Sequence, residues 1–155
     1  MRNATHLTVA TFGALAGLVG IEHGTGEILQ GSVAPDGLVI LSWPDAPFFE
    51  SLAGEPAMTL LPNLLLAGIL SCLFSLAYLI TAVRFSHRRN APAALLVLAA
   101  VMLVVGAGFG PPVLGGIVAL AATRIRRPLN AKRIRLPGSL QTILAQLWPW
   151  TYGAA

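Results

Sequence analysis

Long apolar segments alternate with short charged or turn-forming segments along this chain of 155 residues. A helix needs about 20 apolar residues to cross the hydrocarbon of a bilayer. Four segments approach that length, and they predict membrane spans over about residues 7–26, 59–83, 92–108 and 111–124. The predicted fold class is therefore all-α, a polytopic bundle of four helices that forms a single membrane domain over residues 1–155.

The third and fourth spans come from one uncharged stretch, residues 92–123, which is too long for a single crossing. The segment GAGFGPP, residues 106–112, interrupts it. Glycines favour a turn and a proline pair is favoured at a helix start, so this segment predicts a helical hairpin.

Two segments lie outside the predicted spans. Residues 31–58 form an outer loop whose turn signals and aromatic residues indicate an ordered structure, and Thr59 is the expected N-cap of the second span. In the inner tail, residues 125–155, an amphipathic stripe predicts either a helix on the membrane surface or a partial fifth span; it consists of Leu140, Ile143, Leu144 and Leu147.

The charges are segregated along the sequence. All six acidic residues lie between Glu22 and Glu55, and all ten lysines and arginines lie outside that window. Lys and Arg are enriched on the cytoplasmic side of membrane proteins. The pattern predicts a protein of the inner cell membrane, with both the N-terminus and the tail cytoplasmic and the 31–58 loop outside. The lipid bilayer is thus an expected partner, and nucleic acid is not, because no aromatic-rich basic patch is present.

A candidate polar site lies near the end of the first span, at Glu22, His23 and Glu27. His23 and Glu27 are four residues apart, so their side chains can meet, whereas Glu22 is expected to point to a different side. Such a pair could be a structural contact at headgroup level, a proton relay or a metal-ligand pair. One histidine is too few for a transition-metal site, so no metal is predicted.

The outer loop supplies further candidates for that region, namely Trp43, Asp45 and Glu55. Its carboxylates could fold back over the end of the first span. Its tryptophan fits the aromatic belt of a membrane interface.

One face of the first span consists of glycines at spacings of three or four residues: Gly13, Gly17, Gly20 and Gly24. Small residues at this spacing let another helix approach closely. The partner helix could belong to the same chain or to a second one.

Three function classes follow from these features. The first is a non-enzymatic helix-packing subunit of a homo-oligomer or of a larger membrane complex. The alternative is a small proton- or cation-coupled transporter or channel that uses Glu27 and His23. An enzyme acting on a lipid or quinone is the least favoured, because the sequence shows no catalytic or phosphate-binding motif. The sequence does not identify a cofactor.

The segments IEHGTGEILQG, ILSWPD, AGEPAMTLLPNLLLAGIL and GAGFGPP lie between residues 21 and 112. Together they resemble an uncharacterised group of small bacterial polytopic membrane proteins. The resemblance implies the membrane class and attaches no activity.

Overall fold

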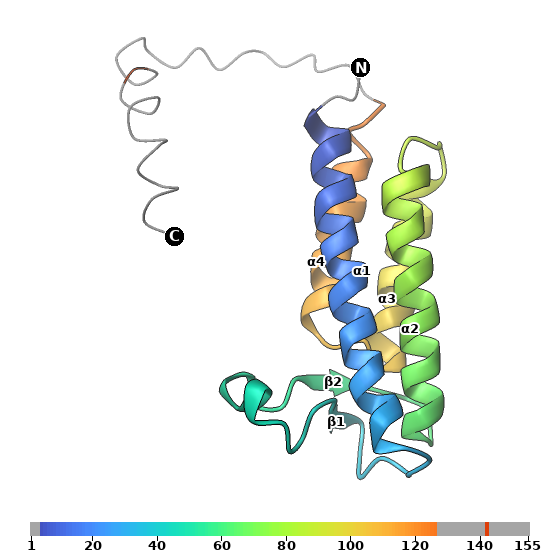
Figure 1. Cartoon of the computed structure of the whole chain (residues 1–155). Helices are drawn as coiled ribbons and strands as arrows, with labels where there is room; N and C mark the ends of the chain where they lie inside the picture. The colour runs from blue at the N-terminus through green and yellow to red at the C-terminus, as the bar shows by residue number, and fades with distance from the viewer. Residues whose placement is uncertain (1–3, 127–141, 143–155) are drawn as a thin grey trace.

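The computed structural model describes residues 4–126 and residue 142, and these residues are mostly helical. Four α-helices pack side by side, and a small cap of residues 31–63 covers one end of them (Figure 1). The helices are α1 (Ala4–Gln30), α2 (Leu64–Ile80), α3 (Ala91–Val105) and α4 (Gly110–Ala122). The predicted tail helix falls, apart from residue 142, outside the described residues.

Two helices are long and apolar enough to cross a membrane. One is α1, and the other is α2 together with the π-helical turn η2 (Thr81–Phe85) that continues it. The helices α3 and α4 are shorter, roughly 22 and 20 Å at 1.5 Å per residue. The helical class of the prediction is thus confirmed, together with two helices of spanning length.

The cap differs from the predicted all-α fold because it contains two strands. Its strands β1 (Val39–Leu41) and β2 (Pro56–Met58) pair as an antiparallel hairpin, and between them lies the 3₁₀ helix η1 (Pro47–Leu52). The hairpin is also tied to the bundle, because the amide of Leu60 donates to the carbonyl of Val104, 2.9 Å away. The expectation of an ordered loop is therefore correct for this segment.

The start of the second helix differs from the prediction. Asn63, not Thr59, is the N-cap of α2, and its side chain accepts a hydrogen bond from the amide of Leu66. Thr59 instead forms a β-bridge with Val105 at the end of α3. Residues 59–63, which were expected to begin the second span, therefore belong to the cap.

The bundle core is small and mainly aliphatic. Its largest fully buried side chains include Val9 of α1, Tyr78 of α2, and Leu95 and Met102 of α3. Two buried hydroxyl groups add polar links: Ser71 donates to the carbonyl of Val105, 3.0 Å away, and Tyr78 to that of Gly115, 2.8 Å away. These bonds link α2 to both α3 and α4.

The hairpin turn forms where it was predicted. Gly106 ends α3 with a φ of 112°, Gly108 has a φ of 80°, and Pro111 and Pro112 begin α4. Because α1 and α3 end at the cap while α2 and α4 start there, the α3–α4 turn lies beside the end of α1 (Figure 1). This arrangement places two glycines against the candidate polar site.

The two ends of the bundle carry opposite charges. All six acidic residues belong to the last turns of α1 or to the cap. The described arginines lie at the opposite end, after α2 and α4: Arg84, Arg88, Arg89, Arg124 and Arg126.

Candidate functional site

The site occupies the cap end of α1, where His23 and Glu27 are almost completely removed from solvent. Their exposed fractions are 2% and 0%. Charged groups are rarely buried to this degree unless they are paired. Their partners therefore indicate what each group can do.

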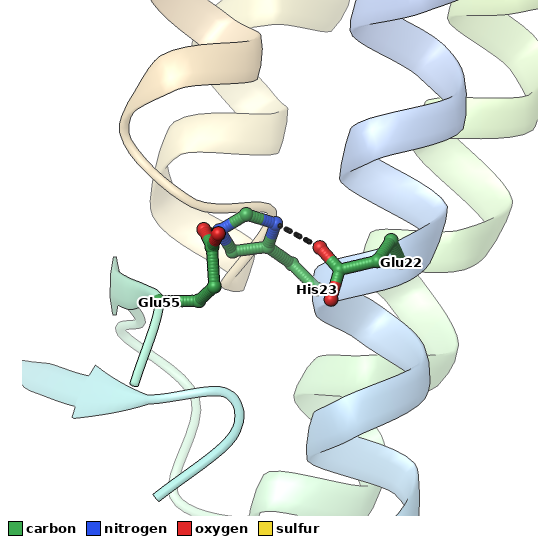
Figure 2. A group of neighbouring side chains, drawn as sticks. All are labelled: Glu22, His23 and Glu55. Carbon is green, nitrogen blue, oxygen red and sulfur yellow. Dashed lines mark ion pairs between the residues drawn. The ribbon is translucent and has the colours of Figure 1, made fainter. Parts of the chain in front are cut away.

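His23 lies between two carboxylates (Figure 2). Its Nδ1 is 3.0 Å from Oε2 of Glu22, on the same helix, and its Nε2 is 2.9 Å from Oε2 of Glu55, which comes from the cap. Nδ1 also lies 3.0 Å from the carbonyl oxygen of Val19, one turn earlier in α1. Carbonyl and carboxylate oxygens are acceptors, so both ring nitrogens face acceptors.

A neutral imidazole has only one N–H group, whereas an imidazolium has two. The neutral ring of His23 can donate on one side only, towards Glu55 or towards Val19 and Glu22. The protonated ring donates on both sides at once. The geometry thus fits an imidazolium between two carboxylates.

Glu55 reaches His23 from an unusual backbone conformation. Its φ is 56°, and the two residues before it, Ala53 and Gly54, also have positive φ values. Only glycine adopts this left-handed region without cost. The turn is followed directly by β2, so it fixes the direction in which the Glu55 side chain leaves the cap.

Glu27 has a different environment. Neither of its carboxyl oxygens has a hydrogen-bond partner among the described residues. The hydroxyl of Ser42 lies next to the carboxyl group but makes no hydrogen bond of normal geometry with it. An isolated carboxylate is very costly to bury, so Glu27 is expected to be held in its neutral, protonated form.

The α3–α4 turn closes over both groups. A Cβ atom on Gly106 would collide with both carboxyl oxygens of Glu27, and one on Gly108 would collide with Nε2 of His23. Both glycines also have positive φ values. Each of the two glycines is therefore required for two reasons, its backbone conformation and its close contact with a side chain of the site.

Three groups of the site could be considered as metal ligands. One ligand atom each from Glu22, His23 and Glu55 lies within 4.8 Å of the others. The two carboxylates, however, contact opposite nitrogens of the ring, and Gly108 packs against Nε2. A metal ion needs donor atoms that converge on one point, so this arrangement fits an ion-pair network better than a metal centre.

The structure changes two of the predicted side-chain contacts. His23 pairs with Glu22, which was expected to point elsewhere, and with Glu55 rather than with Glu27. The i, i+4 spacing permits the predicted contact, but the α3–α4 turn lies against both side chains and gives Glu27 its own buried position.

The remaining loop candidates differ in their distance from the site. Trp43 stacks on Phe49, with ring centroids 5.1 Å apart, and its indole lies next to the Glu22 carboxylate. Asp45 is exposed and lines a cleft of about 250 Å³ together with Glu50. Of the predicted loop residues, Glu55 and Trp43 thus reach the site.

Two contacts of the site were not anticipated from the sequence. Gly26 packs directly against Ser42 and Trp43 of the cap, and Ser42 in turn reaches Glu27. The paired glycines of the α3–α4 turn were predicted to form a turn, but nothing in their spacing indicated which side chains they would cover.

The glycine face of α1 packs against other helices of the same chain. A Cβ on Gly17 would lie 2.6 Å from the Cβ of Leu79, and one on Gly24 would lie 2.7 Å from the carbonyl oxygen of Gly68. Gly13 and Gly20 meet Ala82 and Ser75 in the same way. Because α2 fills this face, the glycines act within the chain.

The chain matches no protein-family model, no curated protein and no solved structure. Its function is therefore inferred from the geometry of its own residues.

Proposed function

We propose that this chain is a small membrane protein of four spans that binds and releases a proton at Glu27 as part of proton-coupled transport. The observation that carries the proposal is the complete burial of Glu27, whose two carboxyl oxygens have no hydrogen-bond partner in the part of the chain that the structure describes. Ionisable groups inside membrane proteins are costly, and they mark proton and ion pathways. His23, four residues earlier and paired with two carboxylates, supplies a second protonatable group beside it.

The outer surface of the bundle supports the membrane part of the proposal. Large apolar side chains are exposed on all four helices; they include Leu7, Leu18, Ile69, Leu73, Leu96, Val97, Val113, Ile117 and Leu120. The buried positions, by contrast, include serine, tyrosine, histidine and glutamate. Apolar side chains outside and polar groups inside suit a bundle surrounded by lipid.

The charge distribution supports an orientation. The arginines at the far end of the bundle would face the cytoplasm, and the acidic cap would face outside. Because α3 and α4 are short, the arginines after α4 would reach the headgroups along their flexible stems, or the bilayer would thin locally. The start of α1 and the end of α4 would then both lie on the cytoplasmic side.

A flux measurement tests the proposal. The purified protein is reconstituted in vesicles with an imposed pH gradient, and proton movement is followed with a pH-sensitive dye. Glu27→Gln keeps the size of the side chain but removes the exchangeable proton, so we expect the protein-dependent flux to be lost. The matched control is Glu50→Gln, which changes an exposed carboxylate of the cap and should leave the flux unchanged. Equal flux in the wild type and in Glu27→Gln would refute the proposal.

A second candidate function, a helix-packing subunit, is favoured by one separate feature. A cleft of about 180 Å³ opens between α3 and α4, lined by Ala99, Ala100, Gly116 and larger apolar residues, and no atom lies within 4 Å of a Cβ built on Gly116. A helix of another chain could pack there closely. Cross-linking in native membranes tests it: Gly116→Leu should abolish a specific cross-linked product, and an unchanged product would exclude this cleft as the interface.

A further inference from the structure

The cap is fastened to α1 on both sides of Glu27. His23, Glu27 and Gln30 follow one another at helical spacing and share one face of α1. The side-chain amide of Gln30 donates to the carbonyls of Leu41 and Ser42, each 3.0 Å away. On the other side of Glu27, Glu55 holds His23. The cap segment that runs from Ser42 to Glu55 thus closes over the buried carboxyl group.

Of the two contacts that hold the cap on α1, the one between Glu55 and His23 is unusual. Gln30 uses a neutral amide and backbone carbonyls, whereas the contact of Glu55 joins two groups whose charges can change. Glu55 also makes this contact from a left-handed backbone conformation. A residue that is not glycine persists there only when its surroundings hold it, and such residues cluster at clamps and switches.

We propose that the Glu55–His23 ion pair is a proton-dependent latch that controls access to Glu27 from the cap side. With a proton on Nε2, His23 donates a charge-assisted hydrogen bond to Glu55 and the cap is closed. When Nε2 loses that proton, its lone pair faces a carboxylate oxygen, and two acceptors repel each other. The contact then breaks, and the cap segment from Ser42 to Glu55 can move away from Glu27.

The groups that face His23 and Glu27 define what can drive the latch. Glu22 and Glu27 share α1 with His23, and Glu55 comes from the cap. On α2, the thiol of Cys72 interacts electrostatically with Glu27. The α3–α4 turn, residues 106–109, contributes no titratable side chain. A proton that passes from Nε2 of His23 to Glu55 leaves an O–H···N hydrogen bond in place, so the contact breaks only when the proton leaves both groups for water.

The inference rests on the proposed role of Glu27, but its test does not. Ser42 is completely buried beside Glu27, so a cysteine at this position reacts with a maleimide only when the cap opens. The reporter is Ser42→Cys in a Cys72→Ser background, which removes the single native cysteine. The reconstituted protein is labelled with and without Glu55→Gln, and each rate is divided by the rate for the unfolded chain at the same pH.

We expect Glu55→Gln to raise the labelling rate about tenfold or more, the change that corresponds to losing a hydrogen bond between charged groups. The matched control is Glu50→Gln in the same cap, which should leave the rate unchanged. Raising the pH should accelerate labelling in the reporter protein and have little further effect once Glu55 is replaced. An unchanged rate in Glu55→Gln, or an equal increase in Glu50→Gln, would overturn the latch.

Hydrogen exchange separates a local opening from general unfolding. In Glu55→Gln, amide exchange should increase over residues 39–58 and stay constant in the four helices. A parallel increase in the helices would also overturn the latch, because the ion pair would then stabilise the whole fold. If labelling responds as expected while Glu27→Gln still conducts protons, the latch stands and the proposed role of Glu27 fails.

Discussion

Glu27 and His23 lie one helical turn apart on α1, yet their partners give them different chemistry. His23 has an acceptor at each ring nitrogen, whereas Glu27 has no hydrogen-bond partner among the described residues. Their neighbours in the α3–α4 turn are both glycines, so neither side chain is displaced by a Cβ atom. The site thus contains two buried protonatable groups that have different partners.

The buried serines of α2 give a test at the same scale. Ser71 and Ser75 are both fully buried, but within residues 4–126 only Ser71 donates a hydrogen bond, to the carbonyl of Val105. We expect Ser71→Ala to lower the free energy of unfolding by about 1 kcal/mol and Ser75→Ala to leave it nearly unchanged. Detergent-induced unfolding followed by circular dichroism measures both. Equal losses in the two variants would show that Ser75 has a partner.

At the scale of single residues, the sequence identifies the charged groups of the site but not their pairing. Glu22, His23 and Glu27 stand out because they interrupt an apolar helix. Helical spacing favours His23 with Glu27, and the structure instead pairs His23 with Glu55. That partner is far away in the sequence, and its position depends on a turn of positive φ values that no local pattern specifies.

At the scale of the elements, close packing between α1 and α2 depends on the absence of side chains on one face of α1. A Cβ on Gly17 would lie 2.9 Å from the carbonyl oxygen of Ser75, and backbone atoms cannot move aside as a flexible side chain can. The two helices would have to separate. The same face was open to two interpretations from the sequence, because spacing alone does not tell which helix fills a groove.

A pair of Gly→Ala substitutions tests this packing. Gly17→Ala should lower the free energy of unfolding by about 1–3 kcal/mol, the usual cost of overpacking. Gly116→Ala, in open space on α4, should instead be neutral or stabilising by up to about 1 kcal/mol, because alanine favours a helix. The same unfolding titration measures both. A stabilising effect of Gly17→Ala would contradict the packing described.

Gly26 gives the corresponding test for the cap. A Cβ there would collide with the carbonyl oxygen of Ser42 and lie 2.7 Å from the ring of Trp43. Gly26→Ala should therefore displace the cap and raise amide exchange over residues 39–58, while the core of the bundle keeps its protection. Unchanged exchange in the cap would mean that the cap is not seated on α1 at this residue.

The element boundaries show where sequence reasoning works. The hairpin turn was predicted correctly, because glycines and a proline pair define both its ends. The predicted start of the second helix was wrong. Thr59 and Asn63 are both good N-caps, and the tertiary pairing of Thr59 with Val105 decides between them. Strand pairing in the cap joins residues that are distant in sequence, so no local sequence pattern predicts it.

At the scale of the whole molecule, charge separates along the bundle axis. The acidic cap and the arginine-rich end lie at opposite ends, as the charge pattern of the sequence implies for an even number of crossings. In the proposed orientation, each polar end would face one side of the membrane. The buried site lies close to the acidic end, beneath the cap.

Labelling from the two sides of a membrane tests this orientation. Single cysteines at Asp45 in the cap and at Arg89 at the opposite end, each in the Cys72→Ser background, are exposed to an impermeant maleimide on intact cells. We expect the cysteine at position 45 to react and the one at position 89 to react only after the membrane is opened. Labelling of both positions from the same side would contradict a bundle that crosses the membrane.

Infrared spectroscopy of the reconstituted protein can detect the proposed proton on Glu27 inside the closed protein. A protonated carboxyl group has a C=O stretching band that carboxylates lack, and exposed acidic residues are ionised at neutral pH. We expect such a band at neutral pH in the wild type, its loss in Glu27→Gln and its retention in Glu50→Gln. No band in the wild type, or a band that survives in Glu27→Gln, would contradict the proposal.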